Sequence, residues 1–120
     1  YINESGIGID YYDFYHFLNG LVDYENWNKN IDYSSKHLRL RKQSNVWTNS
    51  STIYDAFKQL FTQFKDSIMA ISYRSNGTPT INELVDILKG LNKEIEIHYS
   101  QQIKYVLSKK KCNEVLIIAR

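Results

Sequence analysis

Three stretches of the chain carry apolar residues at the spacing of one helix face. The first predicts a helix from Tyr11 to about Tyr24, with Asp10 as its N-cap, and the second predicts a helix from Ser51 to Lys65. The third follows Thr80, which forms a capping-box pattern with Glu83. The apolar positions, in chain order, are Phe14, Phe17, Leu18, Leu21, Ile53, Phe57, Leu60, Phe61, Phe64, Ile81, Leu84, Val85 and Leu88. We expect these stripes to face the core.

Three further stretches have the patterns of strands. Ile68–Ile71 and Val115–Ala119 are continuous apolar runs, which predict strands buried on both faces, whereas Glu94–Tyr99 alternates as an edge strand with one wet face does. A helix at 81–90 is long enough for a parallel crossover, and Gln101–Asn113 suits a long hairpin. The predicted sheet order is therefore first strand, last strand, middle strand, with the last strand antiparallel to both neighbours.

That order leaves the outer edge of the first strand without a partner. Ile68–Ile71 is too apolar for a natural sheet edge, because unpaired backbone groups on an apolar strand attract other strands. The chain is therefore expected to be a fragment of a larger sheet. We expect it to self-associate through this open edge, to cover the edge with Tyr1–Ile9, or to bind a missing half.

The segment from Glu25 to Ser50 has no sustained period and is predicted to be a long loop. It contains Trp27, Tyr33 and Trp47, which argue against plain disorder. The alternation in Leu38–Arg41 allows a short strand or a hairpin arm. A nucleic-acid contact is favoured over a solvated basic loop with its tryptophans packed on the body.

Composition indicates one globular domain of 120 residues, with 42% hydrophobic residues, ten Tyr and a net charge of +2. Cys112 is the single cysteine, so no internal disulfide can form. We expect no signal peptide, and the sequence has no apolar run of the roughly 20 residues that span a bilayer. The expected location is cytoplasmic, without a membrane partner.

The basic residues gather in two segments that contain no acid, Tyr33–Tyr54 and Tyr99–Asn113. Two such segments predict one polyanion-binding face that meets DNA phosphates without reading sequence. The predicted DNA-binding residues are Lys36, His37, Arg39, Arg41, Lys42, Trp47, Lys104, Lys109, Lys110 and Lys111.

The local sequence resembles a known family in several places, namely residues 15–21, 31–37, Trp47, 64–67, 71–77 and 115–118. These stretches resemble adenine-specific DNA methyltransferases of the Asp-Pro-Pro-Tyr class, over nearly the whole chain. The similarity is to the part that follows the catalytic motif. The chain itself contains neither Asp-Pro-Pro-Tyr nor the glycine-rich cofactor loop, and its only proline is Pro79.

The resemblance implies an α/β fold, with a partial Rossmann-like methyltransferase sheet of three C-terminal strands, the last one antiparallel, flanking helices and a long basic loop at 25–50. Residues 1–120 would form a single C-terminal fragment of the catalytic domain. The complete enzyme would transfer methyl from S-adenosylmethionine to the adenine amino group of duplex DNA after flipping the base. The fragment alone is expected to bind no cofactor and to be inactive.

The resemblance also suggests roles for individual residues. Tyr12 and His16 would flank the cofactor side, although a helix-surface role is the alternative for His16. Ser72, Tyr73 and Arg74 would line the floor of the catalytic cleft, with a strand-end cap as the alternative for Ser72. Tyr105 would lie beside the flipped base or simply pack in the hairpin.

Two functions of another kind stay open. One is a small non-enzymatic nucleic-acid-binding module that uses the same basic segments, and the other is an interaction domain that recruits a partner by strand addition. No metal site for a nuclease is predicted, because His16, His37 and His98 are scattered and Cys112 stands alone.

Overall fold

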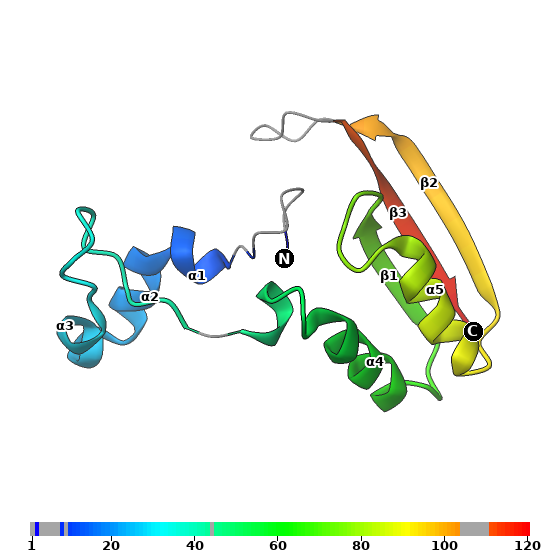
Figure 1. Cartoon of the computed structure of the whole chain (residues 1–120), viewed down its shortest axis with the longest axis horizontal. Helices are drawn as coiled ribbons and strands as arrows, with labels where there is room; N and C mark the ends of the chain where they lie inside the picture. Colours follow the sequence, from blue (N-terminus) through cyan, green and yellow to red (C-terminus); the bar gives the residue numbers. More distant parts are fainter. Residues whose placement is uncertain (1, 3–7, 9, 44, 104–110) are drawn as a thin grey trace.

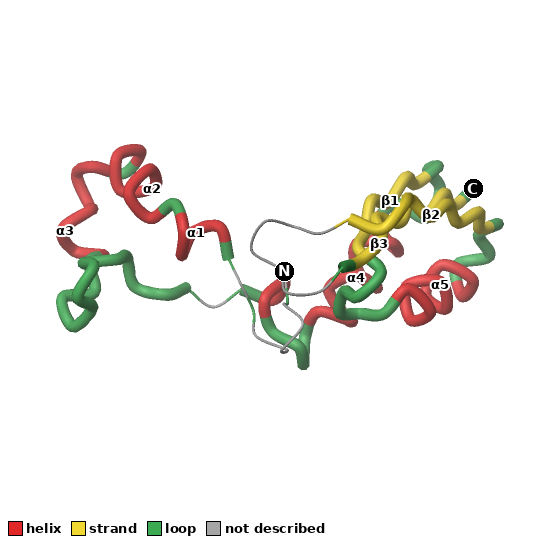
Figure 2. Tube along the Cα trace, turned by 90° about the horizontal axis from the view of Figure 1, so that it is seen from above, coloured by secondary structure: helices red, strands yellow, loops and turns green. Residues whose placement is uncertain are grey.

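The computed structural model describes residues 2, 8, 10–43, 45–103 and 111–120, which form two parts (Figures 1 and 2). Residues 10–43, called the lobe here, contain α1 (Tyr11–Phe14), α2 (His16–Val22), the 3₁₀ turn η1 (Tyr24–Asn26) and α3 (Trp27–Asn30). The rest from residue 45 onward, called the body, contains η2 (Val46–Thr48), α4 (Ile53–Gln63), β1 (Met69–Arg74), α5 (Ile81–Gly90), β2 (Ile95–Ile103) and β3 (Cys112–Ala119). Figure 1 shows α1, α2 and α3 on one side of the molecule and the sheet on the other.

The body is a small α/β unit built on an open sheet with the order β1-β3-β2. β3 runs antiparallel to both neighbours, and Ile117 is paired with Ile71 on one side and Ile97 on the other. The predicted sheet order is therefore confirmed, as are the edge position of β2 and the central position of β3. α5 connects β1 to β2, which run in the same direction.

The core lies on one face of this sheet. Leu84 and Leu88 of α5 and Ile117 of β3 have no exposed surface, and Phe61 of α4 packs into the same cluster. The other face carries no helix from this cluster, so the prediction that β1 and β3 are buried on both faces was wrong. Leu116 of β3 is 41% exposed on that face. Ala70 is exposed, and Ile68, just before the strand, is 73% exposed. An antiparallel sheet is commonly covered on one face only, which explains the difference.

The two helices of the body match their sequence patterns closely. Thr80 Oγ1 accepts a hydrogen bond from the Glu83 amide at 3.3 Å, and Glu83 Oε2 accepts one from the Thr80 amide at 2.6 Å, which confirms the capping box of α5. α4 is shorter than predicted. Phe64, expected in the core, follows the helix and is 46% exposed.

The lobe departs further from prediction, because the expected helix from Tyr11 to Tyr24 is broken at Tyr15 into α1 and α2. Asp10 does cap α1, accepting from the Tyr12 amide at 3.0 Å. The expectation that the stripe faces a core is wrong for all four of its members. Phe14, Phe17, Leu18 and Leu21 are 62%, 55%, 55% and 49% exposed.

Residues 25–50 are not a structureless loop, since they contain part of η1, α3, η2 and an isolated antiparallel bridge between Ile31 and Leu40. The predicted strand at Leu38–Arg41 is reduced to that one bridge, and Leu38 adopts a positive φ of 48°. Both tryptophans pack internally. Trp27 contacts Gly20, and Trp47 meets the Phe57 ring edge-on with centroids 5.2 Å apart.

Candidate nucleic-acid interface

The predicted cleft residues Ser72, Tyr73 and Arg74 belong to β1 itself and not to a loop after it. Consecutive side chains of a strand point to opposite faces, so these three do not line one surface. Ser72 is exposed on the open face of the sheet. Tyr73 lies on the helix side, where its hydroxyl donates to the Pro79 carbonyl at 2.7 Å. Burial, with a smaller contribution from the Glu83 carboxylate, raises the pKa of Tyr73 to about 12.

The turn after β1 is held by hydrogen bonds with a structural role. Arg74 Nε donates to Asn76 Oδ1 at 2.7 Å. The Ser75 amide donates to the Asn113 carbonyl at 2.9 Å, and the Asn113 amide donates to Ser75 Oγ at 3.0 Å. These bonds fasten the end of β1 to the start of β3. They favour a strand-end role for this region.

The open face of the sheet holds a shallow cavity of about 290 Å³, lined by Ser72, His98, Tyr99, Ser100, Glu114, Val115 and Leu116. Ser72 and His98 lie opposite Leu116 on either side of β3, so their backbones are about 10 Å apart, two strand spacings. That separation is too large for a serine–histidine hydrogen bond. His98 Nε2 instead pairs with Glu96 Oε1 at 2.9 Å. The cavity therefore offers no assembled nucleophile.

The basic residues predicted from the first acid-free segment all lie on the lobe surface. Lys36, His37, Arg39, Arg41 and Lys42 are exposed. Lys36, His37 and Arg39 lie within the turn that the Ile31–Leu40 bridge closes. Arg41 follows the turn, and its amide donates to the Asn30 carbonyl at 2.8 Å. This arrangement presents several cations on one short hairpin-like segment.

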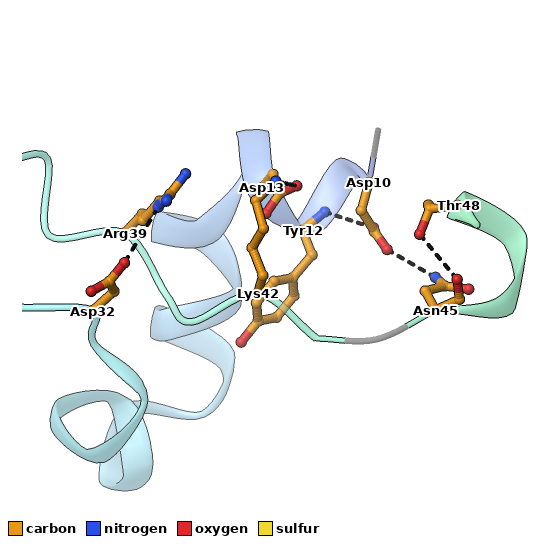
Figure 3. Close-up of polar contacts among 8 residues, drawn as sticks. All are labelled: Asp10, Tyr12, Asp13, Asp32, Arg39, Lys42, Asn45 and Thr48. Carbon is orange, nitrogen blue, oxygen red and sulfur yellow. Dashed lines mark hydrogen bonds and ion pairs between the residues drawn. The ribbon is translucent and has the colours of Figure 1, made fainter. Parts of the chain in front are cut away.

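Acids from other parts of the lobe neutralise two of these cations. Arg39 Nε lies 3.6 Å from Asp32 Oδ2, and Lys42 Nζ lies 3.5 Å from Asp13 Oδ2 (Figure 3). Hydrogen bonds from Ser34, helped by the Arg39 charge, lower the pKa of Asp32. Among the described residues, Lys36 and Arg41 make no ion pair, so a segment free of acid in sequence is only partly free of acid in space.

Most of the lysines of the second basic segment lie outside the described residues. This applies to Lys104, Lys109 and Lys110, and also to Tyr105, and Lys111 is the first described residue after them. Lys111 is exposed directly before β3. Whether the two basic segments share one face stays a prediction.

A second, larger cavity of about 570 Å³ lies where the lobe meets the body. Its lining includes Tyr12 and Lys42 from the lobe and Trp47 from η2. Asp10 joins the two parts here, because its second carboxylate oxygen accepts from Asn45 Nδ2 at 2.8 Å (Figure 3). The bonds from the Tyr12 amide and from Asn45 lower the pKa of Asp10. Sequence patterns gave Asp10 a capping role and no signal for the bond to Asn45.

The predicted cofactor residues do not form a site by themselves. Tyr12 lines the larger cavity, but His16 is not among its lining residues. His16 Nδ1 is buried and has no hydrogen-bond partner among the described residues. The chain has no glycine-rich loop to hold a nucleotide-like cofactor. Without further protein, these residues therefore do not fit S-adenosylmethionine.

Comparison with protein-family models, with curated proteins and with solved structures gave no match. Within the described ranges, no group of three or more His, Cys, Asp or Glu side chains could hold a metal ion. No helix in those ranges is long and apolar enough to cross a membrane.

Proposed function

We propose that this chain is the C-terminal part of the catalytic domain of an adenine-specific DNA methyltransferase of the Asp-Pro-Pro-Tyr class, and that it is inactive alone. The complete enzyme would transfer methyl from S-adenosylmethionine to the adenine amino group of duplex DNA. The observation that carries the proposal is the sheet order β1-β3-β2 with an antiparallel last strand in the middle. A Rossmann-like methyltransferase sheet ends in this way.

The free edge of β1 supports the idea of a larger sheet. β3 is the neighbour of β1 in the described sheet, and Ile68, which enters the strand, is 73% exposed. An apolar strand with a free edge is a template for another strand. In the proposed enzyme, the strand that leads into Asp-Pro-Pro-Tyr fills this position and brings the missing catalytic residues to the sheet.

The basic surface of the lobe supports a role near duplex DNA. Lys36 and Arg41 of the lobe are exposed, and neutralising phosphates with such side chains gives salt-dependent attraction without sequence reading. Lys111 of the body is also exposed. Sequence-specific contacts and base flipping would require the rest of the enzyme.

Reconstitution tests this function directly. The polypeptide encoded upstream of Tyr1 is produced separately, mixed with the 120-residue chain, and assayed for labelled methyl transfer from S-adenosylmethionine to duplex DNA. We expect the upstream sequence to contain Asp-Pro-Pro-Tyr and a glycine-rich loop, and we expect activity from the mixture alone. Activity of the isolated chain, or an upstream sequence without these motifs, would contradict the proposal.

A pair of variants tests whether the β1 edge takes part in the reconstitution. Ile68→Lys places a charge at the edge and should weaken reconstitution, whereas Gln59→Lys adds the same charge at an exposed position of α4 and should not. Equal activity of the two reconstituted variants would argue that the edge takes no part in assembly.

The second candidate is a non-enzymatic module that recruits a partner by adding a strand to β1, with or without nucleic-acid binding. The same free edge favours it, because main-chain hydrogen bonds alone can hold an added strand. The reconstitution assay separates the two candidates, since a module of this kind would bind a partner at β1 and give no methyl transfer with it.

A further inference from the structure

One face of the lobe is apolar and uncovered. Six side chains form it, and we call them the lobe apolar face: Tyr11, Phe14, Tyr15, Leu18, Leu21 and Val22. Their exposed fractions run from 49% for Leu21 to 90% for Val22. They recur three or four residues apart, which places them along one side of a helix.

The break between α1 and α2 does not disperse this face. The Tyr15 amide donates to the Tyr11 carbonyl at 2.8 Å, and the Asn19 amide donates to the Tyr15 carbonyl at 3.1 Å, so helical bonds continue on both sides of the break. The Tyr11 and Tyr15 rings stack with centroids 5.8 Å apart. The six residues therefore form one continuous strip.

The internal contacts of the lobe use a different side of α2. Gly20 is buried against the Trp27 ring, and Phe17, although 55% exposed, meets that ring edge-on with centroids 5.8 Å apart. The lobe thus packs through Phe17 and Gly20. It leaves the lobe apolar face free for another molecule.

This face is at the upper end of the apolar patch sizes found on monomers. With ~150 to 250 Å² for a large side chain, its exposed fractions leave roughly 600 Å² of apolar surface. The largest apolar patch of a typical monomer is about 300 to 600 Å², and a stable interface buries about 800 Å² per partner. The face and a modest polar rim together reach the size of a stable interface.

Its chemistry selects the kind of partner. Residues 11–22 contain no Lys or Arg, which nucleic acid and anionic membranes would require. The acid beside the face, Asp13, is neutralised within the lobe by Lys42. An uncharged surface rich in Tyr, Phe and Leu resembles the centre of a protein–protein interface.

We propose that the lobe apolar face is the contact of a two-fold dimer, in which α1 and α2 of one chain pack on α1 and α2 of a second copy. A two-fold contact uses the same patch on both partners, and an uncharged apolar strip is complementary to itself. This dimer goes beyond the proposed methyltransferase function. It differs from association through β1, because its residues lie on the lobe.

Sedimentation velocity of the 120-residue chain over a wide concentration range tests the dimer. The test variant is Leu18→Glu with Val22→Glu, and the matched control is Ile68→Glu with Leu116→Glu, which adds the same charge at the β1 edge and the open sheet face. All four positions are substantially exposed, so both variants should fold, as far-ultraviolet circular dichroism would verify. We expect a wild-type dimer, a control that dimerises equally, and a test variant whose dissociation constant rises about thirtyfold or more.

Three results would overturn the proposal. The first is a wild-type chain that stays monomeric at every concentration. The second is a dimer that the control variant dissociates, which would place the contact on the sheet. The third is a monomeric chain that sediments with phosphatidylcholine vesicles while the Leu18→Glu, Val22→Glu variant does not, which would assign the face to a lipid surface.

Discussion

The lobe and the body use the same kind of helical pattern with opposite results. In α5, the stripe that contains Leu84 and Leu88 is fully buried against the sheet. In α1 and α2, a stripe of similar spacing is about half exposed, and within residues 10–43 only Gly20 and Leu40 are buried. Periodicity shows which face of a helix is apolar. It does not show whether the same chain supplies the surface that covers it.

The way in which the lobe is attached to the body reflects this difference in packing. The body is stabilised by its own core, whereas the lobe is tied to the body by specific polar contacts such as the Asp10–Asn45 hydrogen bond. Between them lies the larger cavity and not a packed interface. Independent behaviour of the two parts is therefore the physical expectation.

The largest expected effect comes from truncating the body core. Leu88→Ala should lower the free energy of unfolding by about 2 to 5 kcal/mol, because Leu88 is fully buried and the cavity can close only in part. The matched change in the lobe, Leu18→Ala, should cost within about 0.5 kcal/mol when the chain is monomeric. Urea unfolding measures both. Equal losses would show that the lobe stripe is as well packed as the core.

The next effect tests the packing of the lobe itself. In Gly20→Ala, the new Cβ would lie 2.5 Å from the Trp27 ring, so the ring must move at a cost of about 1 to 3 kcal/mol. We expect altered Trp27 fluorescence and an unchanged unfolding transition of the body. Gly90→Ala is the matched control, since nothing lies within 4 Å of its Cβ position. A Trp27 fluorescence spectrum that is the same in Gly20→Ala and Gly90→Ala as in the wild type would refute the contact between Gly20 and Trp27.

The α5 cap should have a smaller effect that depends on pH. Thr80→Ala removes the cap and should cost about 1 kcal/mol in thermal or urea unfolding. The hydrogen bonds from Thr80 lower the pKa of Glu83 below its ordinary value of 4.5. The contribution of Glu83 is therefore complete above that value and is lost as pH falls through the lowered pKa. The difference in the free energy of unfolding between wild type and Glu83→Gln should therefore shrink as the pH falls, and a difference that grows would contradict this prediction.

The smallest effect concerns DNA. Lys36→Gln with Arg41→Gln should reduce the slope of log affinity against log salt by about 0.9 for each phosphate that the variant no longer neutralises. Arg39→Gln with Lys42→Gln should reduce it less, because Asp32 and Asp13 already pair with these residues. Fluorescence anisotropy with a labelled duplex measures both slopes. A larger change in the second variant would mean that the ion pairs open on binding.

Sequence patterns predicted most of the body because its determinants are local. The capping box at Thr80 and Glu83 depends on residues three apart, and the strand order follows from the length of each connection. The burial of β1 was mispredicted because a run of apolar residues does not show how many faces are covered. The number of covered faces depends on whether another part of the chain packs on the second face.

The candidate sites were harder to predict because they depend on distant pairs. The hydrogen bond from Asn45 to Asp10 and the ion pair between Lys42 and Asp13 join residues far apart in sequence, and neither has a local signal. Gly20 has no sequence signal for its role as the place where Trp27 packs. A glycine pattern does not indicate which distant ring will fill the space.

Hydrogen exchange resolved by mass spectrometry tests the central comparison most directly. It would follow the Leu18→Glu, Val22→Glu variant, which is expected to stay monomeric. We predict that amides of α5 and β3 exchange slowly, through unfolding of the whole body, and that amides of α2 exchange much faster through opening of the lobe alone. Equally slow exchange in α2 and α5 would contradict this difference, because the lobe would then share one cooperative core with the body.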